Sequence, residues 1–455
     1  DSEVRNESQT AKNLHIEVVV VDHQCQIVTK FASPVATVDP AQDLDCEYLT
    51  AVPEDAYAEE PAPTEITSRD STVLKASGLA EGLQFWSPDT PYLYKVYSIL
   101  KAGDAILDIQ AVTTGFRKLE VRGGRDGGVF INDQYYWLTG YAQRATNEWA
   151  VIGIGQDWLK EYDAKLIREN NANFIRWMHI AAQPGDIRAA DKYGVVCVQP
   201  GGDKEKDVEG RQWDQRVEVM RDTIIYFRNS PSILFWEAGN NAITVEHMRE
   251  MVGLRQALDP YGRPMGCRSL DDLQAVEVSE WVGTMLGRRV RDREGYHERG
   301  KQIRDRRAVV ETEYHRDESP RRVWDDFSPP DYDYVNFFTG SNGAKQPLKD
   351  AWDLTQEDFI LRHVRGYHEF WSRRMQAGAP EPFYSAAAMM IWSDSNQHGR
   401  LQATENCRMS GRVDPIRIKK PSFYAMQTLQ SPVPAIFLVG HWNYPTDPKA
   451  YVYGI

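Results

Sequence analysis

Two hydrophobic patterns divide the chain. Up to about residue 118, short runs of β-branched and aromatic residues are broken by Asp, Gly and Pro, as in HIEVVVVD, QIVTKFAS, LYKVYSIL and ILDIQAVTTGF. Evenly spaced short strands of this kind are typical of a β-sandwich of about 100 residues. We therefore predict a β-sandwich in this part, with the acidic, proline-rich residues 53–71 forming a solvated loop.

From about residue 119, strand patterns alternate with helical ones. The predicted strands are YYWLTGYA, NFIRWMHI, VVCVQP, SILFWEAGN, RPMGCRSL, AVEVSEWVG, RAVVETEY and AAAMMIWSDSN. Helical patterns such as DWLKEYDAKLIRENN and TVEHMREMVGLRQALDP lie between them, and Thr244 is the predicted N-cap of the second of these. Eight strands with intervening helices predict a (β/α)8 TIM barrel.

Composition and charge exclude several classes of protein. The formal net charge of −13 argues against general nucleic-acid binding, which needs a basic surface. No stretch approaches the roughly 20 apolar residues of a membrane span. The five cysteines are scattered and no CxxC or HExxH motif occurs, so we predict neither a disulfide framework nor a metal or other cofactor. The 13 Trp and 22 Tyr suit a sugar-binding cleft, although core packing explains most of them.

Candidate chemistry follows the strands. In a (β/α)8 barrel, catalytic groups lie at the C-terminal ends of the strands. Carboxylates, amides, Arg, His and Trp occur at these ends. Glycoside hydrolysis needs one carboxylate as nucleophile or base, one acid to protonate the leaving oxygen, and aromatic rings to hold the sugar. The candidates are Arg176, Trp177, Met178, His179, Gln199, Trp236, Glu237, Asn240, Asn241, Glu280, Trp281, Glu311, Glu313, Tyr314, His315, Trp392, Asp394, Asn396 and His398.

The order of the motifs resembles glycoside hydrolase family 2, which contains β-galactosidases, β-glucuronidases and β-mannosidases. The similar segments are VRNES, FWSPDTPYLYKV, GFRKLEV, FINDQYYWLTGY, NANFIRWMHI, RNSPSILFWEAGNN and VVETEY. The resemblance implies an immunoglobulin-like β-sandwich over residues 1–118, the barrel over 119–431, and the start of a truncated C-terminal β-sandwich at 432–455. It also implies a jelly-roll domain ahead of residue 1, so we expect a piece of a longer protein.

The resemblance also assigns roles to particular residues. Glu313 matches the family's nucleophile, although a carboxylate there could also be a plain ion-pair partner. Arg176 and His179 match the pair that orients the nucleophile and binds the sugar. Asn240 matches the ligand of the sugar 2-hydroxyl, and Trp392 matches the aromatic floor of the sugar subsite. The other predicted substrate-binding residues are Trp281, Tyr314, Asp394 and Asn396. Glu311 lies deeper in the barrel than Glu313, and we expect it to be structural.

Asn241 departs from the family pattern, because the family has its general acid/base Glu at this position. An amide cannot donate a proton as a carboxylic acid does. One explanation is an engineered substrate trap, for which Gln would be the usual choice. A second is an acid supplied from elsewhere, with Glu237 the leading candidate and Glu246 or His315 behind it. A third is a site that has lost hydrolysis and kept binding. We favour the supplied acid.

Two basic segments, at residues 287–307 and 398–420, stand out in an acidic protein. The first is either a solvated helix or an electropositive wall that recognises a uronate, a sulfate or an anionic polysaccharide. The second resembles an ordered loop that forms a subsite.

The hypothesis is therefore an exo-acting, retaining β-glycoside hydrolase for a plant or algal oligo- or polysaccharide with an anionic sugar. The alternatives are a carbohydrate-binding pseudoenzyme and a polysaccharide lyase that uses a Tyr or His base. The expected partner is a carbohydrate, and a homo-oligomer stays open. No signal peptide is visible in DSEVRNESQT, which begins in mid-pattern, and a secreted or periplasmic location is favoured.

Overall fold

The computed structural model describes residues 1–41, 71–124, 127–144, 155–202, 206–268, 273–284, 302–314, 384–394, 411–440 and 452–454. The chain forms two compact units. The first contains Asp1–Gln84 and Leu93–Thr114, and the second contains Phe85–Tyr92 and Gly115–Ile455. The predicted boundary was residue 118, and in the structure the second unit begins at Gly115. Phe85–Tyr92 also belongs to the second unit.

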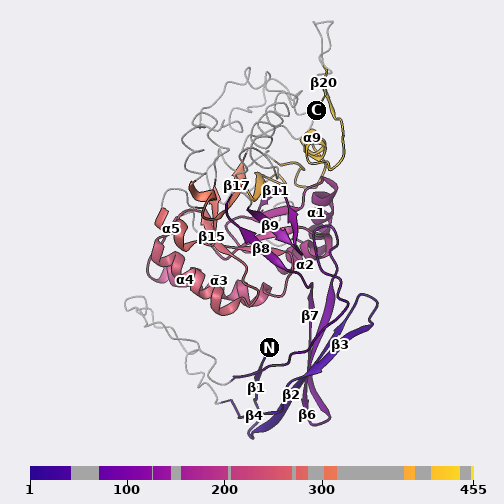
Figure 1. Ribbon diagram of the computed structural model, residues 1–455, viewed down its shortest axis with the longest axis vertical. Helices are drawn as coiled ribbons and strands as arrows, with labels where there is room; N and C mark the ends of the chain where they lie inside the picture. The colour runs from indigo at the N-terminus through magenta and orange to yellow at the C-terminus, as the bar shows by residue number, and fades with distance from the viewer. Residues whose placement is uncertain are drawn as a thin grey trace. The chain divides into compact units, whose positions relative to one another are not determined.

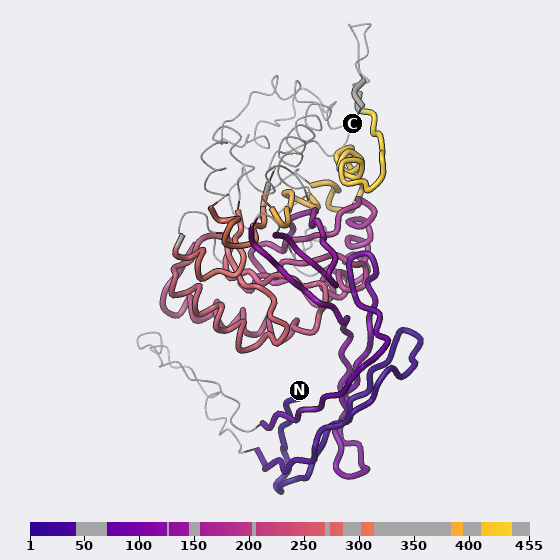
Figure 2. The backbone as a smooth tube through the Cα atoms, viewed as in Figure 1, coloured from indigo at the N-terminus to yellow at the C-terminus, as the bar shows by residue number. Residues whose placement is uncertain are grey.

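The first unit is built from β-strands, as the sequence predicts (indigo to purple in Figure 2). Four strands form a sheet in the order β3-β2-β6-β7, β4 pairs with β2, and β1 pairs with β5. In β2, alternate residues such as Leu14, Ile16 and Val18 are buried, which is the period-two pattern of a half-buried strand. Residues 53–70 of the predicted acidic loop lie outside the described residues. The bounds are β1 Ser2–Arg5, β2 Lys12–Val21, β3 Ile27–Ala32, β4 Ala36–Val38, β5 Ser71–Leu74, β6 Tyr94–Ala102 and β7 Ala105–Thr114.

A small antiparallel sheet precedes the barrel, and it corrects one prediction. The predicted first strand, YYWLTGYA, is divided, because its two tyrosines lie in a hairpin whose tight turn is formed by Asn132 and Asp133, both with positive φ (53° and 66°). Such turns join antiparallel strands, and Asn and Asp tolerate the left-handed backbone that they require. The hairpin of β9 (Gly128–Ile131) and β10 (Gln134–Tyr136) pairs with β8 (Leu119–Arg122), and the first barrel strand begins only at Leu138.

The second unit contains a closed barrel of eight parallel strands, which confirms the predicted fold (Figure 1). The strands are β11 Leu138–Gln143, β12 Phe174–Trp177, β13 Val196–Pro200, β14 Ile233–Gly239, β15 Met265–Arg268, β16 Trp281–Thr284, β17 Ala308–Tyr314 and β18 Ala386–Met390. The described residues also form α1 Asp157–Glu169, α2 Pro184–Tyr193, α3 Arg211–Phe227, α4 Val245–Leu258, α5 Leu273–Val278 and α9 Pro421–Leu429. After α9, β19 (Leu438–Gly440) pairs antiparallel with β20 (Val452–Gly454), and the C-terminal sandwich stays a prediction.

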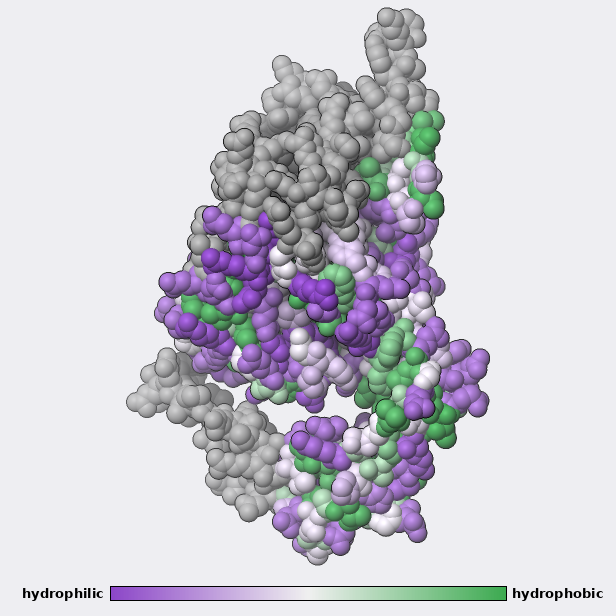
Figure 3. Space-filling model, in the orientation of Figure 1, coloured by the Kyte–Doolittle hydropathy of each residue, from purple (hydrophilic) through white to green (hydrophobic). Residues whose placement is uncertain are grey.

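Helices α3 and α4 have the cap and the buried side typical of helices on the surface of a barrel. Thr244 caps α4, since its hydroxyl accepts a hydrogen bond from the backbone N–H of His247 at 3.3 Å. Helix α3 buries Trp213, Met220 and Ile224 on one side. The opposite side faces solvent, and the surface over α3 and α4 in Figure 3 is mainly hydrophilic.

The sixth strand differs from its prediction. The run AVEVSEWVG is not one strand: AVEV lies in α5, and β16 begins at Trp281. A short apolar run does not by itself distinguish a strand from a buried helix. The consequence is that Trp281 lies at the N-terminal end of its strand, and Glu280 precedes the strand altogether.

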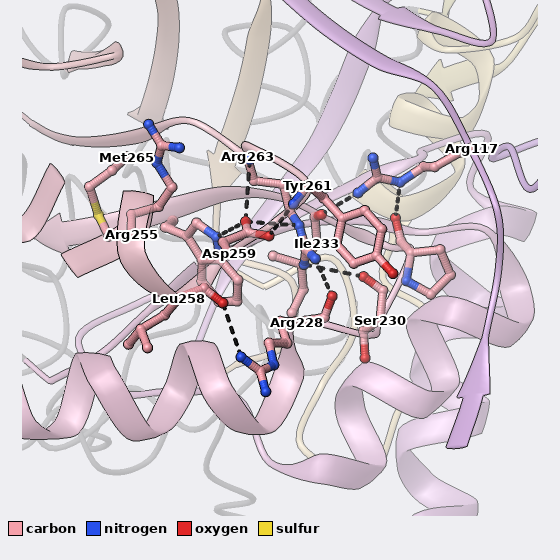
Figure 4. A network of polar contacts seen from close by, with 12 residues as sticks. Arg117, Arg228, Ser230, Ile233, Arg255, Leu258, Asp259, Tyr261, Arg263 and Met265 are labelled. Carbon is pink, nitrogen blue, oxygen red and sulfur yellow. Dashed lines mark hydrogen bonds and ion pairs between the residues drawn. The ribbon is translucent and has the colours of Figure 1, made fainter. Parts of the chain in front are cut away.

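A network of buried polar groups fixes the base of β14 (Figure 4). Arg117 donates from Nε to the carbonyl of Pro231 at 2.6 Å and from Nη2 to that of Ile233 at 2.7 Å. Burial lowers the pKa of Arg117 to about 9, so it is still cationic at neutral pH. Asp259 accepts from Trp236 Nε1 at 2.8 Å and pairs with Arg263 at 3.2 Å. These contacts hold the strand whose other end enters the candidate site.

We expect Asp259→Ala to destabilise the protein. Both Asp259 and Arg263 are buried, so the substitution leaves a guanidinium inside the protein without its carboxylate. Breaking a buried pair in this way costs roughly 3–5 kcal/mol, which a urea titration would show as a lower midpoint. Asp222→Ala is the control, since Asp222 pairs with Arg221 on the exposed side of α3 and such pairs contribute about 0–1 kcal/mol. Equal midpoints for the two variants would contradict the expectation.

Candidate active site

Arg176 joins three barrel strands at their C-terminal ends. It lies on β12 and is fully buried. Its Nε donates to Glu237 Oε2 at 2.7 Å, and its Nη2 donates both to Glu237 Oε1 and, at 2.8 Å, to Asn240 Oδ1. Its Nη1 donates to Glu313 Oε1 on β17 at 3.0 Å. Burial alone would lower the pKa of Arg176, but the two carboxylates raise it above its ordinary value. The structure therefore brings together four of the predicted site residues.

Glu313, the predicted nucleophile, is nearly but not fully buried. Its side chain is 8% exposed, against 0% for Arg176 and Glu237. Besides Arg176, the guanidinium of Arg268 lies close, with Nη1 3.5 Å from Glu313 Oε1. Two cations beside one carboxylate favour its ionised form, which is the form that a nucleophile needs.

Glu237 is not placed to donate a proton. Its side chain is fully buried, and each of its oxygens accepts an N–H from Arg176. A carboxylic acid that donates a proton needs an O–H group directed at the substrate. Both oxygens of Glu237 instead act as acceptors for the guanidinium of Arg176. This geometry does not favour Glu237 as the missing acid, and its role as proton donor stays a prediction. Glu246 is no better placed, because its side chain is 78% exposed on α4 and pairs with Arg249. His315 lies outside the described residues.

The two consecutive amides follow β14 directly. Asn240 is buried and Asn241 is half-buried. The loop that carries them is held by Asp207, whose Oδ2 accepts the backbone N–H of Thr244 at 2.7 Å and whose Oδ1 lies 2.9 Å from His247 Nδ1. The His247 ring stacks on Trp213 with 3.6 Å between ring centroids. These contacts hold the loop after β14 and therefore the position of Asn241.

Arg268 is the functional candidate that the sequence did not reveal. It is the last residue of β15, and its Nη2 donates to Asn241 Oδ1. Its side chain is 14% exposed. The one available signal was its place at the end of a barrel strand, since the segment GCRSL contains no carboxylate or aromatic residue.

Other predicted residues flank Arg176 and Glu313 in the sequence. His179 follows β12, is half-buried and has a positive φ of 66°, an uncommon backbone for a residue other than glycine. Glu311 is fully buried and accepts from Thr284 Oγ1 at 2.7 Å, which agrees with its predicted structural position. Only the backbone of Tyr314 is described, and Asn396 lies outside the described residues.

Trp281 is not a sugar-binding residue in this structure. It begins β16 and pairs with Gly266 and Ala308, which also lie near the starts of their strands. The ring is fully buried, and its Nε1 donates to the carbonyl of Trp236 at 2.9 Å. It therefore occupies the end of the barrel opposite the candidate site.

The predicted eighth-strand residues also make internal contacts. Trp392 is fully buried, and its Nε1 donates to Asp163 Oδ1 on α1 at 2.8 Å, so its ring is not available as a floor for sugar. Asp394 pairs with Lys420 at 2.9 Å and accepts from the backbone of Gly411. Burial raises the pKa of Asp394, and Lys420 opposes this shift. Both side chains join β18 to its surroundings, contrary to the expectation that they bind substrate.

The basic segments are only partly described. Residues 287–301 and 398–410 lie outside the described residues, so the electropositive wall stays a prediction. In the remainder of the second segment, Arg417 pairs with Asp163 at 2.7 Å and Lys419 pairs with Glu169. These cations bind α1 and do not form an open subsite.

Two family models match the chain. Residues 123–320 match the one described as glycosyl hydrolases family 2, TIM barrel domain, and residues 3–117 match the one described as glycosyl hydrolases family 2. Together they span more than half of the sequence, in the order of the two structural units. The chain belongs to glycoside hydrolase family 2.

Several individual proteins are similar to this family 2 chain. A β-glucuronidase of Formosa agariphila is 36% identical over 374 residues, which are 81% of this chain and 35% of the relative. A β-galactosidase of Alteromonas mediterranea is 28% identical over 194 residues, 40% of this chain and 18% of the relative. A solved family 2 β-glucuronidase superposes with a TM-score of 0.76 at 31% identity, covering 99% of this chain and 42% of that one. The chain spans less than half the length of each of these proteins.

The described residues contain neither a helix suited to a membrane nor a cluster suited to a metal ion. None of their helices is long and apolar enough to cross a membrane. Within the same residues, no group of three or more His, Cys, Asp and Glu side chains is arranged to hold a metal ion.

Glu237→Gln tests the structural assignment of this residue. The amide keeps the size of the side chain but removes the charge that compensates the buried Arg176, so we expect a lower unfolding midpoint, by roughly 3–5 kcal/mol in stability. Any catalytic rate should fall by a similar factor for substrates with good and poor leaving groups, since Glu237 does not protonate the leaving oxygen. A loss confined to poor leaving groups would restore Glu237 as the acid.

Proposed function

We propose that this protein is a retaining β-glycoside hydrolase that acts on a β-linked uronic acid. The observation that carries the proposal is the position of Glu313 at the C-terminal end of a barrel strand, ion-paired with Arg176 and 3.5 Å from Arg268. The β-glucuronidases among the similar proteins support a uronate as the sugar. The plant or algal origin of the substrate and the exo mode of attack stay predictions.

The mechanism starts from the ionised carboxylate. Glu313 attacks the anomeric carbon as the glycosidic bond breaks, and a glycosyl ester forms. Water then opens the ester and regenerates the carboxylate with the configuration retained. Arg176 holds the nucleophile in place, and Asn240, fixed by the same guanidinium, lies beside it. Among the described residues, no carboxylic acid is placed to protonate the leaving oxygen, so the first step depends on the quality of the leaving group.

A second candidate function follows from Asn241. A protein that binds the sugar without turnover needs no acid, and the loss of the family's Glu favours this alternative. It predicts saturable binding of the sugar with no release of phenol from activated aryl glycosides. Activated glycosides need little help from an acid, so they separate the two functions.

We expect the protein to release phenol from aryl β-glucuronides with acidic phenols, and Glu313→Gln to lower kcat/KM by at least about 10³-fold. The amide is nearly the same size as the carboxylate but is a far weaker nucleophile. Glu311→Gln is the matched control, because it changes a carboxylate on the same strand whose partner is Thr284. The measurement is continuous release of nitrophenol, and equal activity in the two variants would contradict the role of Glu313.

Azide tests the second step. Without a general base at position 241, hydrolysis of the glycosyl ester should limit turnover of good substrates, so phenol should appear in a burst. A small anionic nucleophile needs no base, and we expect azide to raise kcat by about 10-fold or more and to yield the β-glycosyl azide. NMR of the product would identify the anomer. An α-azide, or no azide product at all from a turning-over enzyme, would rule out the retaining route.

A further inference from the structure

Arg268 lies between the nucleophile and the position of the missing acid. Its Nη2 donates to Asn241 Oδ1, and its Nη1 is 3.5 Å from Glu313 Oε1. Its side chain is partly exposed at 14%, whereas the other guanidinium that contacts Glu313, that of Arg176, is fully buried. Of these two guanidinium groups, Arg268 is therefore the one that can contact a bound molecule.

We infer that Arg268 is a catalytic residue that stabilises, by its positive charge, the glycosidic oxygen as it leaves. The inference rests on the proposed function, because it concerns the first step of glycoside hydrolysis. In the family, the acid at position 241 lies beside the leaving oxygen. A group that is hydrogen-bonded to the side chain at this position lies within reach of the same oxygen.

The contribution of Arg268 is electrostatic. A guanidinium does not give up its proton at neutral pH, so it cannot replace a carboxylic acid as a donor. It can lower the energy of negative charge that develops on an oxygen, which is how fixed cations and N–H groups act in many active sites. Partial exclusion of water strengthens this effect, since a weakly screened charge acts more strongly.

The charges of the cluster balance through the reaction. Before reaction, Arg176 and Arg268 face the carboxylates of Glu237 and Glu313, so two positive groups meet two negative ones. When Glu313 Oε bonds to the anomeric carbon, its charge is lost and the electron pair of the broken bond goes to the leaving oxygen. That oxygen then carries the negative charge beside Arg268 and takes its proton from water. In the second step water supplies the hydroxyl group and releases its proton to solvent.

The same contact explains why an amide suits position 241. A carboxyl group placed there would meet the guanidinium of Arg268 and would be held as an ionised partner. An ionised carboxylate donates no proton. Asn and Arg at these two positions therefore form a compatible pair, whereas an acid at position 241 would require a neutral neighbour.

The test is the dependence of kcat/KM on the leaving group. Aryl β-glucuronides whose phenols have pKa values from about 4 to 10 would be compared in the unmodified chain, Arg268→Met, Arg268→Lys and Arg249→Met. The last is the control, because it removes an exposed guanidinium on α4 whose side chain is 64% exposed. Charge stabilisation of the leaving oxygen predicts that Arg268→Met costs about 10-fold for the most acidic phenol and about 10²–10³-fold for the least acidic one. Arg268→Lys should keep most of the activity.

Three results have distinct meanings. A loss in Arg268→Met that is equal for all phenols would overturn the inference, because Arg268 would then act only by positioning Glu313. A loss seen with glucuronides but not with the matching glucosides would also overturn it, because Arg268 would then recognise the sugar carboxylate. A parent protein that releases no phenol in a Glu313-dependent manner would instead refute the proposed function. If Arg268→Met does not fold, as judged by circular dichroism, Arg268→Lys and Arg268→Gln give the same comparison.

A double substitution provides an independent check. We expect Asn241→Glu alone to change activity on poor leaving groups by less than about 3-fold, since Arg268 keeps the new carboxylate ionised. Asn241→Glu combined with Arg268→Met should regain about 10²-fold over Arg268→Met and should lose activity at alkaline pH, as a protonated acid would. A comparable gain from Asn241→Glu with Arg268 still present would overturn the inferred pairing.

Discussion

The site depends on the buried guanidinium of Arg176. A charge that is fully buried is tolerated only when it is paired and hydrogen-bonded, and Arg176 meets this requirement with partners from two other strands. The two carboxylates are not equivalent. Glu237 is fully buried and binds through both oxygens, whereas Glu313 binds through one and is slightly exposed. Arg176 therefore keeps Glu237 as a counter-charge, so the ester that the proposed mechanism forms at Glu313 would not leave the cation unpaired.

The different contacts of Glu237 and Glu313 bear on the question of what replaces an acid at Asn241. The carboxylate nearest in the sequence, Glu237, is bound by Arg176 through both of its oxygens. A second cation, Arg268, contacts both Asn241 and Glu313, and in the proposed mechanism it stabilises the leaving oxygen. Position 241 therefore has to be considered together with Arg268, which contacts it.

The barrel could be predicted from the sequence because the hydrophobic patterns of its strands and helices involve only residues that are close in the sequence. Helix and strand patterns alternate, the strand ends are defined by polar residues, and the cap at Thr244 follows from the residues beside it. The same local information also brought Arg176, Glu237, Asn240 and Glu313 into one group. It was insufficient where an assignment depends on tertiary contacts.

Several residues and segments were assigned wrongly or missed because their positions depend on tertiary contacts. AVEVSEWVG is apolar enough for a helix or a strand, and the wrong choice moved Trp281 to the wrong end of the barrel. Trp392 and Asp394 follow a strand as expected, but their side chains contact α1 and Lys420, and no local pattern indicates this direction. Arg268 is 27 residues from Asn241 in sequence, so their contact exists only because β14 and β15 are neighbours.

The closure of the barrel has a consequence for how the chain folds during synthesis. Strand β11 must pair with β18, and Gln143 at the end of β11 bonds to Ser393, which lies 250 residues later. Until the ribosome has made β18, both β11 and β17 present unpaired edges, and such edges pair readily with other chains. Contacts of such long range are slow to form. A nascent chain that stops before residue 386 would thus contain Arg176, Glu237 and Glu313 and still be prone to aggregation.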